Sequence, residues 1–242
     1  MKSTALRPHQ VAIVAAALAS LVLWAIPGVH LVLLPLQYLN THIHELCHAI
    51  VATATGGQVQ HIEVHPAGDG VTPILGGNIL LEASAGYVGA TIVGLFIILG
   101  GRSEKVAKMT LRILAIVLML GIIVWVRGSD AADMAFGIGS GIAWVGVLWA
   151  VSTYAKGPTL LFAAQFVGIQ QCLNAVQSLY VLLKLSAFTE VHSDATLLQD
   201  ATHIPAMFWA IGWCVFSSLA VLWGLKKAWT VSPTLSPSPS LP

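Results

Sequence analysis

Long apolar segments alternate with short polar or glycine-rich stretches along most of the chain. The apolar segments cover residues 10–26, 29–54, 79–99, 109–126, 135–155, 159–183 and 204–225. Crossing a bilayer takes a helix of roughly 20 mostly apolar residues, so each segment is about long enough for one crossing. The pattern therefore predicts an all-α polytopic membrane protein with about six to seven transmembrane helices.

Residues 56–77 do not follow this pattern. Gly56-Gly57 ends the second segment, and residues 58–65 then alternate in the way a strand does. Residues 66–70 have turn chemistry, and residues 71–75 suit a returning strand. We expect a small β-hairpin insertion over residues 58–77.

The composition narrows the class of protein. Hydrophobic residues make up 57% of the 242 residues and charged residues only 9%, with a mean hydropathy of +0.83. A soluble domain carries roughly 25% charged residues, so a soluble enzyme is excluded. The 11 Lys and Arg against 10 Asp and Glu leave no basic surface for nucleic acid. We expect one transmembrane domain over residues 1–227 and a disordered Ser/Pro-rich tail over residues 228–242.

The most polar cluster of the second segment has the spacing of a metal site. Residues 44–48 read His-Glu-Leu-Cys-His, an HExxH motif. On a helix the i, i+4 spacing places the imidazoles of His44 and His48 on one face, where both can bind one Zn²⁺. Glu45 follows the first histidine directly, in position to accept a proton from a water that the metal activates. Ionisable residues at membrane depth cost about 2.5–3.5 kcal/mol on insertion scales, which favours a functional site over a chance match.

A catalytic zinc usually has three protein ligands, so a third is needed. The candidates are Glu82, Asp194, Asp200, Glu190, His192 and His65. About four crossings separate the HExxH end of the second segment from the polar stretch 186–203, and an even number places both on the same side. This argument favours Asp194, where Ser193 or Asp194 can also cap a short helix, and it leaves Glu82 as the main competitor.

Taken in order, these motifs resemble the site-2 proteases, a family of intramembrane zinc metalloproteases, and most closely its small bacterial branch without a PDZ domain. The resemblance rests on the HExxH motif with Ala49, the stretch Gly68-Asp69-Gly70-Val71-Thr72, the patch Ala85-Gly86-Tyr87-Val88-Gly89, Ser193-Asp194-Ala195, Thr202-His203-Ile204-Pro205 and Trp209. It spans about residues 40–210. The better-studied branch carries its ligand Asp in an Asn…Pro…Asp-Gly stretch that this sequence lacks. The Ser-Asp-Ala match therefore assigns the third-ligand role to Asp194.

The resemblance implies a zinc endopeptidase with His44, His48 and Asp194 as ligands and Glu45 as the catalytic base. Its expected partners are a membrane protein or peptide substrate and the lipid bilayer, with no nucleic acid. We expect a multi-pass protein of a bacterial plasma membrane. The alternatives are a membrane metal-binding or transport protein that uses the His cluster, and a non-proteolytic relative of the family.

Two further sets of residues have a structural and a functional interpretation. His61, Glu63 and His65 share one face of the expected strand, where a polar, solvated face is favoured over a second metal site. Gly86, Gly89 and Gly94 are expected to permit close helix packing rather than to act in catalysis.

Overall fold

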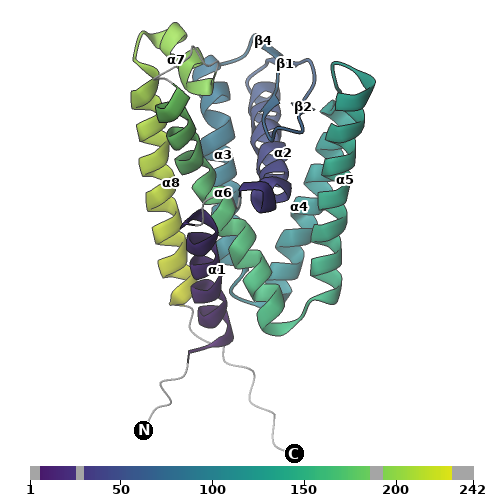
Figure 1. Cartoon of the computed structure of the whole chain (residues 1–242), viewed down its shortest axis with the longest axis vertical. Coiled ribbons are helices and arrows are strands. Elements are labelled where there is room, and N and C mark those ends of the chain that lie inside the picture. Colours follow the sequence, from purple (N-terminus) through teal and green to yellow (C-terminus); the bar gives the residue numbers. More distant parts are fainter. Residues whose placement is uncertain (1–5, 26–29, 186–192, 231–242) are drawn as a thin grey trace, which may run out of the picture.

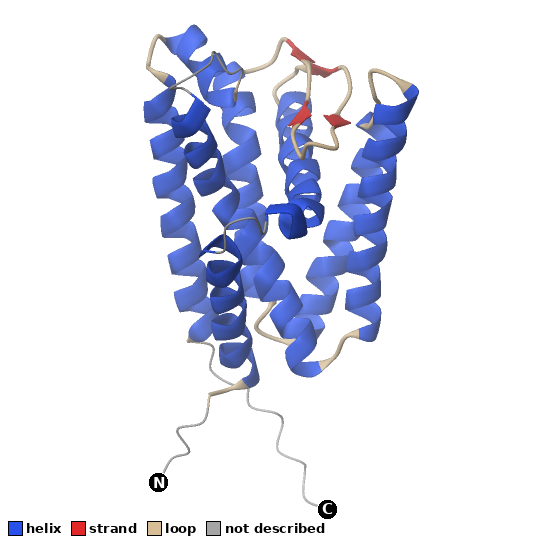
Figure 2. Ribbon diagram, viewed as in Figure 1, coloured by secondary structure: helices blue, strands red, loops and turns tan. Residues whose placement is uncertain are grey.

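A computed structural model describes residues 6–25, 30–185 and 193–230 of the chain. Within these residues the protein forms eight helices and two short pairs of strands (Figure 2). The helices are α1 (Pro8–Ala25), α2 (His30–Ala54), α3 (Ile79–Gly100), α4 (Glu104–Trp125), α5 (Ala131–Tyr154), α6 (Gly157–Leu185), α7 (Asp194–Thr202) and α8 (Ala206–Trp229). The strands are β1 (Gln58–Val59), β2 (Glu63–Val64), β3 (Gly70–Val71) and β4 (Ile74–Leu75).

The apolar segments fold into helices of similar extent, and the predicted fold class is confirmed. Among the described residues, four helices, α3, α4, α5 and α8, are long and apolar enough to cross a membrane. The long helices α1, α2 and α6 pack within the same bundle. Large apolar side chains such as Phe96, Leu120 and Leu219 are more than half exposed, as expected of surfaces that face lipid. Helix α8 continues through Trp229, and the predicted tail beyond residue 230 lies outside the described residues.

Helix α3 holds the bundle together because it packs against α2, α6 and α8. A Cβ atom on Gly94 would lie 2.6 Å from the carbonyl oxygen of Gly168 on α6, so the two backbones approach too closely for a side chain. A Cβ atom on Gly89 would lie 2.8 Å from the Cys47 sulfur on α2. The packing role expected for Gly89 and Gly94 is confirmed.

The direction of the helices defines two ends of the bundle (Figure 1). At the terminal end, α1 begins beside the N-terminus and α8 ends. At the hairpin end, α2 ends beside the strands, and α7 lies at this same end after four crossings by α3, α4, α5 and α6. The parity argument for residues 186–203 is therefore confirmed for α7.

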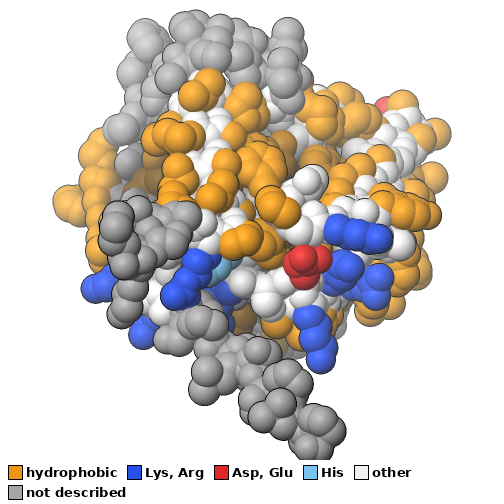
Figure 3. All heavy atoms as spheres, turned by 90° about the horizontal axis from the view of Figure 1, so that it is seen from below, with side chains coloured by type: hydrophobic (Ala, Val, Ile, Leu, Met, Phe, Trp, Pro, Cys, Tyr) orange, Lys and Arg blue, Asp and Glu red, His pale blue; other side chains and the backbone are white. Residues whose placement is uncertain are grey.

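Charge divides between these two ends. Basic side chains described at the terminal end are Arg7, Arg102, Lys105, Lys108, Lys156, Lys226 and Lys227, and Figure 3 shows Lys and Arg grouped on this face. Acidic side chains described at the hairpin end are Glu45, Glu63, Asp69, Glu82, Asp130, Asp133, Asp194 and Asp200, whereas Glu104, at the start of α4, is an acidic residue at the terminal end. Arg127, which follows α4, is a basic residue at the hairpin end.

The insertion after α2 is the predicted hairpin, with its ladder in two short pieces. Strand β1 pairs antiparallel with β4, and β2 pairs antiparallel with β3. The outer edge of the segment that contains β1 and β2 is already paired at Ile62, between these two strands. The Ile62 amide donates to the Trp125 carbonyl (2.8 Å), and the Arg127 amide donates to the Ile62 carbonyl (2.9 Å). Among the described residues, β3 and β4 pair on one side only.

Candidate metal centre and active site

Helix α2 presents the two histidines of the HExxH motif on the side that faces α3. Their ring centroids lie 4.7 Å apart at an interplanar angle of 73°, one helical turn apart as the spacing predicts. The His44 side chain is 12% exposed and that of His48 is 7% exposed. Two imidazoles therefore lie side by side in a largely dry setting.

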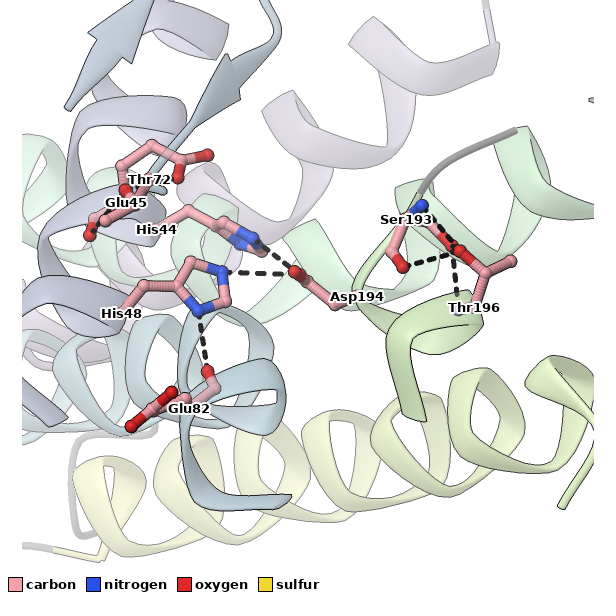
Figure 4. Close-up of polar contacts among 8 residues, drawn as sticks. All are labelled: His44, Glu45, His48, Thr72, Glu82, Ser193, Asp194 and Thr196. Carbon is pink, nitrogen blue, oxygen red and sulfur yellow. Dashed lines mark hydrogen bonds and ion pairs between the residues drawn. The ribbon is translucent and has the colours of Figure 1, made fainter. Parts of the chain in front are cut away.

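Asp194 approaches the same point from α7. One of its carboxylate oxygens, Oδ2, lies 3.1 Å from His44 Nε2 and 3.3 Å from His48 Nε2. One ligand atom from each of the three residues lies within 4.8 Å of the others, and among the described residues no other group of three potential ligands meets this distance. Figure 4 shows the two rings and the carboxylate pointing toward one another.

The local sequence explains how Asp194 reaches this position. Ser193 caps α7: its hydroxyl accepts from the Thr196 amide, and the Thr196 hydroxyl accepts from the Ser193 amide in return. This capping box starts the helix at Asp194, where a carboxylate interacts favourably with the helix dipole. Helix α7 is anchored by a cluster of buried apolar residues at the hairpin end, namely Ala83, Ala195, Leu198, Ala206 and Trp213.

The environment of Asp194 favours its charged form. Burial alone would raise the pKa of this carboxyl, but the adjacent His48 and His44 hold the pKa well below its usual range. A metal ligand must be deprotonated, so the structure supplies this carboxyl in the form that metal binding needs.

Glu82 contributes its backbone rather than its carboxylate. The His48 Nδ1 donates a hydrogen bond to the Glu82 carbonyl oxygen (2.6 Å), so in the neutral ring, the form that binds a metal, the lone pair is on Nε2 and faces Asp194. The Glu82 carboxylate instead accepts from the Thr55 hydroxyl (3.0 Å) and points away from the cluster in Figure 4. A hydrogen bond on the far nitrogen of this kind fixes the tautomer and the ring orientation of a metal-binding histidine.

Gly86 leaves the space in which the histidine nitrogens lie. A Cβ atom at this position would lie 2.2 Å from His44 Nε2 and 2.5 Å from His48 Nε2. Helix α3 therefore approaches the two imidazoles with bare backbone. Tyr87, the next residue, packs edge-on against His44 at 4.5 Å and stacks on Trp213.

Glu45 lies beside the histidines on the side nearer the hairpin. It is 5% exposed, and its Oε2 accepts a hydrogen bond from the Thr72 hydroxyl (2.7 Å). Thr72 belongs to the segment between β3 and β4, so the hairpin holds the glutamate in place. In Figure 4, Glu45 and Thr72 lie on one side of the histidine pair and Asp194 on the other.

The other candidate ligands do not join this cluster. Asp200 is exposed on α7, and His65 hydrogen-bonds within the hairpin to Asp69 and Glu63. Glu190 and His192 lie outside the described residues. His42, two residues before the motif, faces α5 and lies 3.0 Å from the Ser140 hydroxyl.

The roles of three residues at the site were not predicted from the sequence. Gly86 leaves space for the histidine nitrogens, the Glu82 carbonyl accepts from His48, and the Thr72 hydroxyl binds Glu45. The glycine patch around Gly86 was visible in the sequence, but only the packing of α3 on α2 shows which glycine faces the histidines. The hydrogen bond of the Glu82 carbonyl is invisible to side-chain patterns. Thr72 belongs to the stretch 68–72 that resembles the site-2 proteases, but nothing in the sequence showed that its hydroxyl binds Glu45.

Fold and site together define a polytopic membrane protein with a buried His–His–Asp cluster beside a glutamate. Residues 13–224 match the Peptidase M50B-like family, so the chain belongs to this family of membrane peptidases, in agreement with its resemblance to site-2 proteases. No curated protein and no solved structure matches the chain significantly.

Proposed function

We propose that this protein is an intramembrane zinc metalloprotease that hydrolyses peptide bonds of membrane-associated substrates. The observation that carries the proposal is the convergence of His44, His48 and Asp194 on one point, with Glu45 held beside it. Two imidazoles and one carboxylate are a donor set typical of catalytic zinc, which keeps its remaining position for water or substrate.

The residues present fit such a metal. The hydrogen bond from His48 Nδ1 to Glu82 leaves Nε2 as a lone-pair donor, and Gly86 leaves room where any side chain would displace both rings. His44, His48 and Asp194 would hold the ion. When bound, zinc would lower the pKa of a water toward about 7 and polarise the scissile carbonyl.

Glu45 would act as the general base and then as the general acid. It would accept the proton of the attacking water and deliver that proton to the leaving amine. The Thr72 hydroxyl occupies Oε2, so it orients the carboxylate and leaves Oε1 as the oxygen that exchanges the proton. Burial of Glu45 keeps bulk water away from this transfer.

A helical substrate must unwind locally, because its carbonyls are engaged in backbone hydrogen bonds. We propose that the hairpin receives the unwound strand by β-addition. The edge of the first strand is covered at Ile62 by residues 125–127, so the strand would add along residues 70–75. This segment carries Thr72 and so passes directly beside Glu45.

The protein is an integral membrane protein, and we propose that it resides in a bacterial plasma membrane with the terminal end in the cytoplasm. Cytoplasmic loops of membrane proteins carry an excess of Lys and Arg, and the described basic residues gather at the terminal end. The candidate centre would then lie nearer the opposite face. A single cysteine introduced at Ser103 should be shielded from an impermeant maleimide in intact cells, and one at Ser129 should be labelled; the reverse pattern would contradict this orientation.

The test of the proposed function uses Glu45→Gln, with Glu104→Gln at the other end of the bundle as a matched control. Purified protein should carry about one zinc per chain, and Glu45→Gln should keep that zinc because the ligands are untouched. Glu45→Gln should fail to cleave a single-span reporter tagged at both ends, while Glu104→Gln should cleave it. His44→Ala with His48→Ala should lose the tightly held zinc that survives a chelator wash in the wild-type protein. Near wild-type cleavage by Glu45→Gln would refute the mechanism, and unchanged chelator-resistant zinc in the double variant would refute the site.

A further inference from the structure

A second group of metal-ligating side chains lies on the hairpin, apart from the cluster on α2 and α7. His61, Glu63 and His65 are alternate residues of one extended strand, so their side chains project from the same face. The Glu63 side chain is only 12% exposed, whereas those of His61 and His65 are 32% and 28% exposed. A largely buried carboxylate therefore lies between two partly exposed imidazoles.

Both imidazoles direct the same nitrogen at that carboxylate. His61 Nε2 lies 2.9 Å from Glu63 Oε1, and His65 Nε2 lies 3.3 Å from Glu63 Oε2. The candidate centre shows the same arrangement, with two Nε2 atoms directed at the carboxylate of Asp194. Because the hairpin imidazoles contact different oxygens, and one ligand atom from each of the three residues does not lie within 4.8 Å of the others, an ion bound by both would require these side chains to rotate toward one another. The partial exposure of His61 and His65 leaves them room to do so.

Asp69 gives the hairpin group the supporting partner that metal-binding histidines usually have. The His65 Nδ1 lies 2.8 Å from Asp69 Oδ2, and the backbone turn that holds Asp69 is closed by hydrogen bonds from the His65 amide and from the Gly68 amide. Carboxylate contacts to the outer nitrogen orient the ring and raise its basicity as a ligand.

The contacts of His65 call for a positive charge at its Nε2. With Nδ1 donating to Asp69, a neutral ring presents a lone pair at Nε2 toward the Glu63 oxygen, and two acceptors then face each other. Either a proton or a cation must lie between these atoms. His61 directs a second ring nitrogen at the same carboxylate, so three potential ligands converge, which favours a cation that accepts several ligands.

We propose that His61, Glu63 and His65 form a second transition-metal site, specific for Zn²⁺ or a similar borderline divalent ion, with Asp69 orienting His65. Two imidazoles and a carboxylate suit such ions. The site is weaker than the one on α2, since its histidines are more exposed and its ligands lie on a short hairpin. Its ion ties β2 to the turn before β3 and so stiffens the strand pair that continues to Thr72.

The test is a zinc titration of metal-stripped, full-length protein, because the readout is binding and does not depend on proteolysis. The variant His44→Ala/His48→Ala should still bind one Zn²⁺, and adding His61→Ala/His65→Ala should abolish that binding. Asp69→Asn should weaken the hairpin site about 10- to 100-fold, as loss of a supporting carboxylate does elsewhere. The matched control His203→Asn, at an exposed histidine, should change nothing.

Co²⁺ provides a second readout that does not require the ligand variants to fold identically. In His44→Ala/His48→Ala, one bound Co²⁺ should give visible absorption bands of low coordination number, and Zn²⁺ should displace it. Absence of Zn²⁺ and Co²⁺ binding in this variant would overturn the proposal, as would binding that is unaffected by His61→Ala/His65→Ala. Neither result would bear on the zinc at His44 and His48, which the wild-type titration reports separately.

Discussion

Replacing Gly86 with Ala should remove the metal without changing a single ligand. The added Cβ atom would lie 2.2 Å from His44 Nε2, 2.3 Å from His44 Cε1 and 2.5 Å from His48 Nε2. Ordinary van der Waals contact begins at 3.4 Å, so the His44 ring or helix α3 must move by more than an ångström. Both ligand nitrogens are displaced by the same methyl group.

The size of this displacement decides the outcome. Zinc–nitrogen bonds in proteins lie at about 2.0–2.1 Å, and a designed or natural site tolerates only about 0.2 Å of error. A misplacement of about 1 Å at a reacting group costs roughly 100-fold in rate. We expect zinc affinity and cleavage to fall by about that factor or more, whereas overpacking should lower the free energy of unfolding by only about 1–3 kcal/mol.

Two glycine variants separate this effect from general damage. Gly212→Ala on α8 meets no atom within 4 Å and controls for the substitution itself. Gly89→Ala presses on Cys47, so it disturbs the packing of α3 on α2 without touching either ring. Zinc content should be measured by mass spectrometry after a chelator wash, and folding by circular dichroism. Wild-type zinc retention and cleavage in folded Gly86→Ala would refute the role assigned to this glycine.

Three further predictions follow from the contacts around the site. Asp194→Ala should weaken zinc retention and stop cleavage, while Asp200→Ala, on the exposed side of α7, should leave both nearly intact; equal effects of the two changes on zinc content would contradict the assignment. Thr72→Val should lower kcat about tenfold with little change in KM or zinc, because hydrogen bonds to charged groups contribute about 1.5–3 kcal/mol, and Thr72→Ser should restore the rate. Ile74→Pro removes an amide that points to the unpaired edge of β4, because the hydrogen bond from the Gln60 amide to the Pro73 carbonyl makes Ile74 a non-hydrogen-bonded position of the β1–β4 pair. This variant should cleave more weakly at constant zinc content. Unaltered cleavage would contradict the β-addition proposal.

The covered edge of the first strand changes how the hairpin should be probed. Proline at Ile62 or Val64 is the substitution that the sequence suggests for weakening cleavage at constant metal content. In the structure the Ile62 amide binds the Trp125 carbonyl, and the Val64 backbone lies close to Gly137 on α5. Cleavage should still weaken in these variants, but through loss of the contact between the hairpin and α4 and α5. Ile74→Pro is the sharper test.

The pattern of apolar, turn and capping residues in the sequence predicted the helices, the hairpin and the start of the short helix α7. The apolar segments predicted the helices, and Gly56-Gly57 with the turn residues predicted the hairpin. Ser193 and Asp194 were the two predicted caps of a short helix, and Ser193 is the one that caps α7. The i, i+4 spacing of His44 and His48 settled their common face, because helical periodicity alone fixes it. The even number of crossings brought Asp194 to the same end of the bundle as the histidines, which is a topological result rather than a local one.

Features that depend on how helices meet were not predictable in this way. A rule that counts each apolar segment as one crossing places Arg7 opposite Lys105 and Lys226. In the structure α1 and α2 both run toward the hairpin end, so together they make one crossing instead of two. Arg7, Lys105 and Lys226 therefore all lie at the terminal end. Glu82 remained a rival ligand for the same reason, since sequence does not show that its carboxylate turns to Thr55 while its carbonyl receives His48.

The three candidate ligands come from two helices of very different length. His44 and His48 sit on one buried helix turn, fixed by Gly86 behind them and by the Glu82 carbonyl. Asp194 reaches them from α7, a nine-residue helix. The capping box and the helix dipole stabilise the carboxylate at the start of that helix whether or not an ion is bound. A metal bound at this point would therefore join α2 to α7, and the cap at Ser193 places the Asp194 carboxylate there before an ion arrives.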